Sequence, residues 1–153
     1  MRIKMRKISD EKLREIDKYI LVSGEQFLRF LNRNYELPNW FLHKYRTTMD
    51  WDDVCTYQNL NEKFIEEHVD CIDSYSSWGY LCSHQDLSID FLEKHEANID
   101  WSSLIQNAYT VKELVEKFYS HFSLFEIRQR NLIEEFMTEE ELDALEIMHQ
   151  ITK

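Results

Sequence analysis

Glycine and proline are almost absent from this chain of 153 residues, which holds two glycines, Gly24 and Gly79, and one proline, Pro38. Turn-rich β-sandwiches and barrels use such residues at many tight turns, so the composition disfavours those architectures. Hydrophobic residues make up 43% of the chain and aromatic residues 14%. A chain of this length and composition can bury a core without disulfides or metal. We therefore expect an all-α protein.

Cysteine is also scarce, and no long hydrophobic run occurs. Cys55, Cys71 and Cys82 are an odd number without the spacing of a disulfide framework. The basic stretch 1–7 is not followed by an apolar segment of the kind found in secretory signals. No run of about 18 apolar residues is present, as a spanning helix would require. These absences predict a reduced, cytoplasmic setting and no membrane partner.

One short sequence motif, called the repeat phrase below, occurs twice in the middle of the chain. Residues 60–68 read LNEKFIEEH, residues 87–95 read LSIDFLEKH, and each is followed by an Ile-Asp pair and a tryptophan. Aliphatic residues that anchor this phrase recur at intervals of 21 to 27 residues: Leu37, Leu60, Leu87, Val111 and Leu132. Self-similarity at such a period is typical of stacked supersecondary units.

Each unit reads as two helices. The positions four and eight after an anchor share one helical face with it: Phe41, Phe64, Phe91, Val115 and Phe136, then Tyr45, His68, His95 and Tyr119. An aromatic residue fourteen positions after the anchor opens the second helix in most units: Trp51, Trp101 and Phe125, with Trp78 displaced by four. Residues just before the anchors, such as Asn59 and Asp86, are expected to cap the first helices, and Asp50 and Asp100 the second ones.

These patterns predict one domain, 1–153, built as a solenoid of about four to five stacked helix pairs with helical caps at both ends. Residues 1–36 form the N-terminal cap, with helices starting at Ser9 and Ser23. Residues 37–136 form the repeats, and 137–153 the C-terminal capping helix.

Acidic residues dominate the central repeats. The chain carries a formal net charge of -11, and residues 47–100 hold thirteen acids against two bases. Such a surface repels nucleic acid and attracts basic partners. The alternative is a solvated acidic surface that only maintains solubility. Nine acids are the candidate electrostatic contacts: Asp52, Asp53, Glu62, Glu66, Glu67, Asp70, Asp90, Glu93 and Glu96.

The repeat phrase resembles short helical repeats, roughly L-S-x-x-F-I-x-x-h followed by I-D-W-x-x-I, of uncharacterised proteins from bacteriophages and large DNA viruses. The residues that carry the resemblance are Leu60, Phe64, Ile65, Ile72, Asp73, Trp78 and Gln85, then Leu87, Ser88, Phe91, Leu92, Ile99, Asp100 and Trp101. The match covers about 37–108 well and 111–136 weakly. It implies a viral or mobile-element origin and says little about activity, because the motif consists mostly of packing residues.

Charge and resemblance together suggest an inhibitor of a host defence system, of the anti-CRISPR or anti-restriction kind. It would occupy a basic nucleic-acid-binding groove of a host protein or nucleoprotein complex, without contacting nucleic acid directly. The alternative is a non-enzymatic scaffold that binds through exposed aromatic residues, while its acids serve solubility. The aromatic candidates are Tyr57, Tyr75, Tyr80 and Tyr109.

The residue types that most resemble a chemical site are His68, Cys71, Cys82 and His84, four possible zinc ligands. Their spacing matches no standard zinc finger. His68 and Cys82 also recur in register with Tyr45 and Cys55, which favours a packing role. No orienting acid accompanies a possible Cys-His pair, and two isolated glycines cannot form a phosphate loop. We expect no catalytic residues, metal or cofactor.

Overall fold

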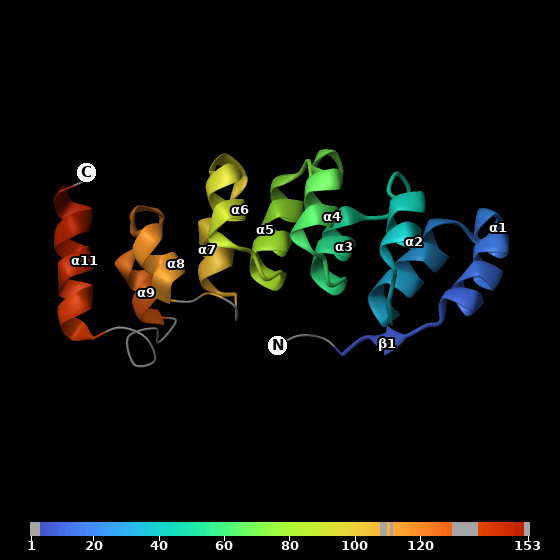
Figure 1. The fold of residues 1–153 in the computed structure, drawn as a ribbon, viewed down its shortest axis with the longest axis horizontal. Helices are drawn as coiled ribbons and strands as arrows, with labels where there is room; N and C mark the ends of the chain where they lie inside the picture. The colour runs from blue at the N-terminus through green and yellow to red at the C-terminus, as the bar shows by residue number, and fades with distance from the viewer. Residues whose placement is uncertain (1–3, 108–109, 111, 130–137, 152–153) are drawn as a thin grey trace.

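The computed structural model describes residues 4–107, 110, 112–129 and 138–151, and this part of the chain is mainly helical (Figure 1). The all-α prediction is thereby confirmed. Two short strands are also present, β1 (Arg6–Lys7) and β2 (Tyr35–Glu36), and they pair in parallel. This pairing, which the sequence pattern did not predict, fastens the N-terminal segment beside the end of the first helix.

The helices follow one another in a row along the long axis of the molecule (Figure 1). Their bounds are α1 (Asp10–Asn34), α2 (Asn39–Lys44), α3 (Trp51–Tyr57), α4 (Glu62–Glu67), α5 (Tyr75–His84), α6 (Ile89–Lys94), α7 (Trp101–Ile105), α8 (Lys112–Lys117), α9 (Leu124–Gln129) and α11 (Glu139–Ile151). Single 3₁₀ turns follow α4, α6 and α8: η1 (Val69–Cys71), η2 (Glu96–Asn98) and η3 (Tyr119–His121). We group the helices from α2 to α9 by chain order into pairs, α2–α3, α4–α5, α6–α7 and α8–α9. Helices α1, α3, α5, α7 and α9 pack one against the next.

Helix α1 is itself a pair of helical segments, because the chain bends at Gly24. The backbone there has φ 68° and ψ -169°, a conformation that glycine adopts at little cost. Ser9 caps the first segment, as predicted, by accepting a hydrogen bond from the Lys12 N–H. The second predicted cap, the Ser23 side chain, lies outside the described side chains.

The first helix of each pair begins two residues after its anchor, so the prediction that Asn59 and Asp86 act as caps is wrong. Asn61 caps α4 and Ser88 caps α6, each through its side chain. Leu60 and Leu87 therefore lie just before the capping residues, and both are buried. A hydrophobic residue at this position can form a hydrophobic staple, which fixes the angle at which the chain enters the helix. For the second helices, the predicted caps Asp50 and Asp100 are confirmed.

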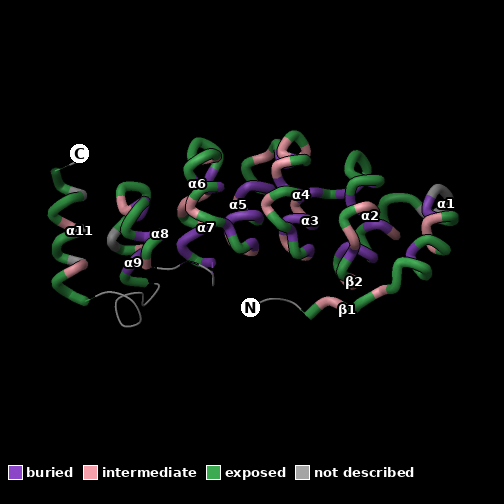
Figure 2. Tube along the Cα trace, in the orientation of Figure 1, coloured by how far each residue is buried: buried purple, intermediate pink, exposed green. Residues whose placement is uncertain are grey.

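Aromatic rings fill the space between successive pairs, and Figure 2 shows the buried segments running through the middle of the row. Trp51 stacks on Phe64 and His68 of the following pair, with interplanar angles of 20° and 26°. Trp78 lies against Phe91 and His95 of its following pair with tilted rings, at interplanar angles of 34° and 40°. The predicted role of these tryptophans between layers is confirmed.

The predicted register of the fourth pair is wrong by one residue. Leu114, Val115 and Phe118 are buried, and they correspond to Phe64, Ile65 and His68 two pairs earlier. The anchor position is therefore Thr110, which is buried, and not Val111, which lies outside the described residues together with Leu132 and Phe136. A shift of one residue turns a helical side chain by about 100°. For this reason Phe125, predicted to fill an interlayer space, is 69% exposed.

Three buried amide side chains, Gln58, Gln85 and Asn107, link each second helix to the one before it, and we call them the amide ladder. Gln85 donates from Nε2 to the carbonyl oxygens of Cys55 and Gln58, both at 2.8 Å, and its Oε1 accepts from the Leu60 N–H at 3.0 Å. Gln58 donates likewise to Asn32 and Tyr35. Asn107 donates to Cys82 and Gln85. Buried carbonyl groups at the helix ends are thus satisfied by the next pair.

Candidate interaction surface

Six of the nine acids predicted to contact a partner also contact a neighbouring helix segment of their own chain. Asp52 accepts hydrogen bonds from the hydroxyls of Ser76 at 2.8 Å and Ser77 at 2.6 Å, at the start of α5. Glu62 accepts from both the N–H and the hydroxyl of Ser88, at the start of α6. Each carboxylate therefore supports the first turn of the next pair.

Three further acids form ion pairs or hydrogen bonds one repeat ahead. Glu66 binds Lys94 Nζ at 2.8 Å and His95 Nε2 at 2.9 Å. The hydrogen bonds from Lys94 and then His95 lower the pKa of the Glu66 carboxyl. Glu93 pairs with Lys117 at 2.7 Å, and Glu96 with His121 at 2.7 Å. These contacts connect α4 with α6, α6 with α8, and η2 with η3.

Asp53 is the most buried of the nine acids, and two arginines of α1 hold it. Arg33 binds both carboxylate oxygens at 2.9 Å, and Arg29 Nε lies 3.5 Å from Oδ2. The hydrogen bonds that Arg33 donates to the Asp53 carboxylate raise the pKa of Arg33. Sequence reasoning missed these links, although acids and bases about one repeat apart could have suggested them.

The remaining predicted acids, Glu67, Asp70 and Asp90, are exposed. The nearest cation to Glu67 is Lys63 at 4.0 Å, within the same helix. Among the described residues, three Lys or Arg side chains outside 47–100 pair with acids inside that range: Arg29, Arg33 and Lys117. Counting these three with the two internal bases against the thirteen acids leaves eight carboxylates in excess. The central repeats therefore keep a negative surface after internal pairing.

Tyr75 and Tyr80 are 80% and 42% exposed and lie together at a shallow groove of about 280 Å³ between α5 and α7. Gly79 also lines this groove, where an added Cβ would approach Asp100 Oδ2 to 3.2 Å, so a larger residue would force the Asp100 side chain to shift. Asp100 raises the pKa of the Tyr75 phenol.

The other two predicted tyrosines do not join this groove in the described part of the structure. Tyr57 is half-buried, with the Arg33 guanidinium 5.7 Å from its ring centre. Tyr109 lies outside the described residues.

The four possible zinc ligands are not gathered into a site. One ring nitrogen of His68 contacts the Phe64 carbonyl and the other contacts His43, both at 2.8 Å. Cys82 is fully buried, and burial raises the pKa of its thiol to about 12. Within the described residues, no group of three or more His, Cys, Asp or Glu side chains could hold a metal ion. The packing interpretation of His68 and Cys82 is confirmed by their burial.

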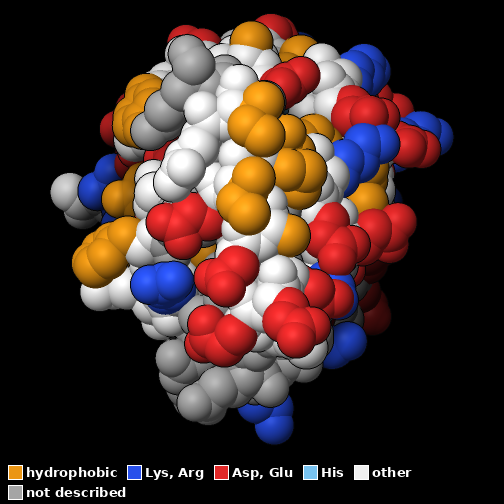
Figure 3. Space-filling model, turned by 90° about the vertical axis from the view of Figure 1, so that its left-hand side faces the viewer, with side chains coloured by type: hydrophobic (Ala, Val, Ile, Leu, Met, Phe, Trp, Pro, Cys, Tyr) orange, Lys and Arg blue, Asp and Glu red, His pale blue; other side chains and the backbone are white. Residues whose placement is uncertain are grey.

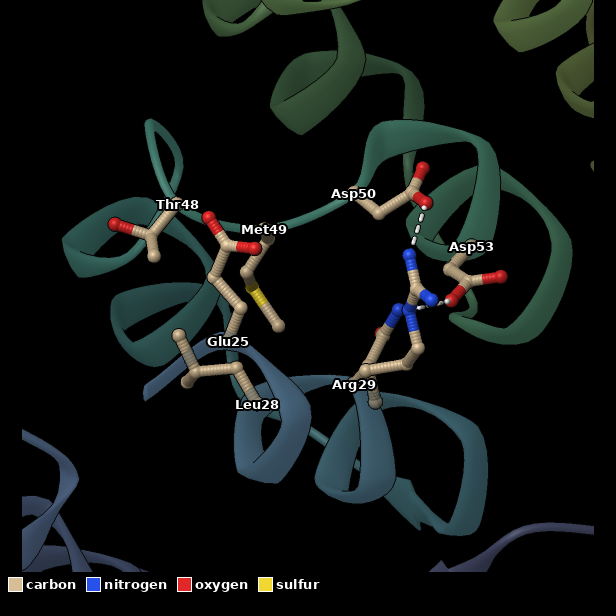
Figure 4. Close-up of a pocket in the computed structure, with 8 residues that line it drawn as sticks. Glu25, Leu28, Arg29, Thr48, Met49, Asp50 and Asp53 are labelled. Atoms are coloured by element: carbon tan, nitrogen blue, oxygen red, sulfur yellow. Dashed lines mark hydrogen bonds and ion pairs between the residues drawn. The ribbon is translucent and has the colours of Figure 1, made fainter. Parts of the chain in front are cut away.

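A cavity of about 240 Å³ lies near the N-terminal end of the row, between the second segment of α1 and the connection from α2 to α3 (Figure 4). Its lining residues are Glu25, Leu28, Arg29, Asn32, Thr48, Met49, Asp50 and Asp53. Of these, the sequence analysis singled out Asp53 as a candidate contact and Asp50 as a helix cap, and it did not associate either residue with a cavity.

The C-terminal end of the row exposes apolar side chains next to acids (Figure 3). Ile147, Met148 and Ile151 on α11 are exposed. Helix α11 packs beside η3, and Lys112 bridges to Glu141 near its start. The outer face of this last helix is therefore not uniformly polar.

Comparisons with family models, with curated proteins and with solved structures found no match. Within the described residues, no helix has both the length and the apolar character that crossing a bilayer demands.

Proposed function

We propose that the protein is a non-enzymatic α-helical solenoid that acts by binding another protein. The row of helix pairs, the tryptophans between them and the amide ladder support this proposal, because each unit satisfies the buried groups of its neighbour. Helices α1 and α11 then act as the end units. Repeat arrays use their extended surfaces for binding. Burial raises the pKa of the Cys55 and Cys82 thiols to about 12, so both are protonated at neutral pH, which disfavours a thiol nucleophile at either position.

The partner we propose is a host protein or nucleoprotein complex with a basic surface. The observation that carries this proposal is the excess of eight carboxylates that remains in residues 47–100 after internal pairing. Such a field steers cationic surfaces into contact. The viral resemblance adds the context of an inhibitor that blocks a basic nucleic-acid-binding groove of a defence enzyme.

The test is a tagged capture from bacterial lysate, with mass spectrometry, at low salt and at about 0.5 M salt, where the Debye length falls to about 4 Å. One variant neutralises the exposed acids Glu67, Asp70 and Asp90 as Gln, Asn and Asn, which leaves the contacts between helix pairs intact. A matched control makes the same charge change at Glu113, Glu140 and Asp143, which are exposed on α8 and α11.

We expect a partner whose capture falls in high salt, falls when duplex DNA is added, and falls in the first variant but not in the control. Capture that survives salt, DNA and the first variant would refute the electrostatic proposal. Asp52, Asp53 and Glu66 are unsuitable for this test, because neutralising them also removes contacts that hold the fold.

A second candidate is recognition through the groove of Tyr75 and Tyr80. Their exposure, together with the shallow hollow between them, favours it, since tyrosines are enriched in the cores of interfaces. Replacing both by alanine would then abolish capture at any salt concentration. The control is Tyr19→Ala, which removes another exposed tyrosine from α1. Capture unchanged by the double replacement would eliminate this candidate.

A further inference from the structure

The amide ladder puts the second helices of successive pairs in register. Its three side chains donate to equivalent backbone carbonyls, those of Asn32, Cys55 and Cys82. The residues four positions before these carbonyls are therefore also equivalent: Leu28, Trp51 and Trp78. Helix α3 begins at Trp51, but α5 begins three residues before Trp78, at Tyr75. The α5 unit thus carries an extra turn, 75–77, and insertions into single repeats often lie on the binding face.

Contacts inside the protein hold this extra turn in place. Ser74 caps it by accepting a hydrogen bond from the Ser77 N–H at 3.0 Å. The Asp52 carboxylate of α3 accepts hydrogen bonds from the hydroxyls of Ser76 and Ser77. The Tyr75 ring is nevertheless 80% exposed, the highest fraction of any large hydrophobic side chain among the described residues. A turn that is fixed from within and leaves its ring in solvent is preorganised to present that ring to a partner.

The groove between α5 and α7 has an aromatic ring on each side of small residues. Tyr75 and Tyr80 line it together with Gly79 and Ser83, all from α5. At about 100° per residue, Gly79 and Ser83 lie between the two tyrosines around the helix axis. The volume of about 280 Å³ is below the roughly 300–1,000 Å³ of sites for drug-sized ligands, so it suits one side chain.

Asp100 of the groove is a carboxylate without a cation. Its Oδ1 accepts a hydrogen bond from the Ser103 N–H, and its charge raises the pKa of the neighbouring Tyr75 phenol. Asp100 forms no ion pair with any residue that the structure describes. Helices α3, α5 and α7 contain no lysine or arginine. The negative charge at the groove therefore favours a cationic occupant.

An arginine of this chain is already held by a tyrosine and an aspartate between α1 and α3. The Arg33 guanidinium binds Asp53 at 2.9 Å and lies 5.7 Å from the ring centre of Tyr57. The groove between α5 and α7 presents the same two kinds of group, and no arginine is among the described residues that line it. A guanidinium is planar and weakly hydrated, so it stacks on aromatic rings more readily than an ammonium group does.

We propose that the groove between α5 and α7 binds an arginine side chain of the basic partner. The guanidinium lies between the rings of Tyr75 and Tyr80 and donates hydrogen bonds to the Asp100 carboxylate. This carboxylate disfavours a phosphate or a nucleotide in the same place. The inference names one contact of the proposed partner and so rests on the proposed function. It differs from recognition by the tyrosines alone, which requires no charge on the partner.

The test titrates the full chain with the acetylated and amidated pentapeptides Gly-Gly-X-Gly-Gly at low salt, where X is arginine, lysine, citrulline or leucine. Citrulline has nearly the shape of arginine without its charge. The ring NMR signals of Tyr75 and Tyr80 report binding. We expect saturable shifts with the arginine peptide, and affinity at least about twofold weaker with lysine and about fivefold weaker with citrulline and leucine. Equal binding of any other peptide, or no saturable shift with arginine, would overturn the proposal.

Four variants test the named groups. Asp100→Asn removes the charge but keeps a residue that caps helices as well as aspartate does. Asp100→Asn and Tyr75→Ala should each weaken arginine-peptide binding at least about threefold, read from the Tyr80 signal, without a large change in Tm. The matched controls Asp143→Asn and Tyr19→Ala change exposed residues of α11 and α1 and should leave the affinity unchanged. Full affinity in Asp100→Asn would refute the assigned role of its charge, and with it the proposal.

Capture experiments connect the groove to the partner. Asp100→Asn should also lower capture of the partner at low salt, and unchanged capture would refute the assignment of the arginine to that partner. If the arginine peptide does not bind but the variant neutralised at Glu67, Asp70 and Asp90 still loses its partner, the groove assignment is wrong and the proposed function stands. If the peptide binds as expected but capture survives high salt and that variant, the arginine site stands and the proposed function is wrong.

Discussion

Removing Gln85 from the amide ladder should destabilise the protein more than any exposed substitution. Gln85 is almost completely buried, and its side chain makes three hydrogen bonds to the backbone of Cys55, Gln58 and Leu60. In Gln85→Ala, two carbonyl oxygens and one N–H lose their partners in the interior. Each unsatisfied group costs about 1–3 kcal/mol. Allowing for water that enters the vacated space, we expect a loss of about 3–6 kcal/mol, against a total stability of about 5–15 kcal/mol for a protein of this class.

The measurement is urea unfolding followed by far-ultraviolet circular dichroism, with thermal unfolding as a second readout. Since 1 kcal/mol shifts Tm by about 2–4 °C at this chain length, a loss of 3 kcal/mol lowers Tm by about 6–12 °C. Gln26→Ala is the matched control, because Gln26 is exposed in α1 and its loss should change stability by less than about 0.5 kcal/mol.

Gln85→Met separates hydrogen bonding from packing, because methionine restores most of the volume but cannot donate to the carbonyls. We expect it to recover less than half of the loss seen in Gln85→Ala. If Gln85→Met proves as stable as the wild type, the ladder contributes packing alone, and a cost from unsatisfied backbone groups is refuted.

Two other predictions concern ionisation. The hydrogen bonds from Lys94 and His95 lower the pKa of the Glu66 carboxyl below its ordinary 4.5, so they stabilise the fold above that pH, and this stabilisation is lost as pH falls through the lowered pKa. Glu66→Gln should therefore be less stable than the wild type at neutral pH, and the difference should disappear in unfolding curves measured in acid. A difference that stays constant with pH would contradict this linkage. Burial raises the pKa of Cys55 and of Cys82 to about 12. A thiol reagent at about pH 8 should therefore modify half-buried Cys71 first and the other two cysteines only as the protein unfolds. Rapid reaction of all three cysteines in the folded state would contradict the burial of Cys55 and Cys82.

The repeat period and the helical class could be predicted from the sequence because they depend on local patterns. Phe64, Phe91 and the repeat tryptophans recur at regular spacings, and the structure buries Phe64, Phe91, Trp51 and Trp78 as expected, while Trp101 is partly buried. The predicted register of the fourth pair was wrong because hydrophobicity alone favours Val111 over Thr110 as the anchor. Thr110 is buried with its hydroxyl donating to the Leu104 carbonyl, a contact that no hydrophobic pattern signals.

The role of the acids could not be read from charge counts, since a count does not show which base lies opposite which acid. Asp53 looks solvent-facing in the sequence, yet Arg33 of α1 reaches it from twenty positions earlier. Glu66 and Glu93 likewise meet Lys94 and Lys117 of the following pair. In a repeat protein, side chains about one period apart are neighbours, so acid–base pairs at that interval should be tested as internal contacts before they are assigned to a partner.

The first unit differs from its neighbours at the positions where those neighbours agree. Where successive units agree, as at Cys55 and Cys82 or at Trp51 and Trp78, the shared residue is explained by packing between layers. The first unit departs from both patterns at once, with Leu28 in place of tryptophan and Asn32 in place of a thiol. The second departure leaves the Asn32 Oδ1 buried without a hydrogen-bond partner among the described residues, which lowers stability. Both departures lie in the second segment of α1, which packs on α3 ahead of the repeated motif, so the packing pattern of the later pairs does not extend to this segment.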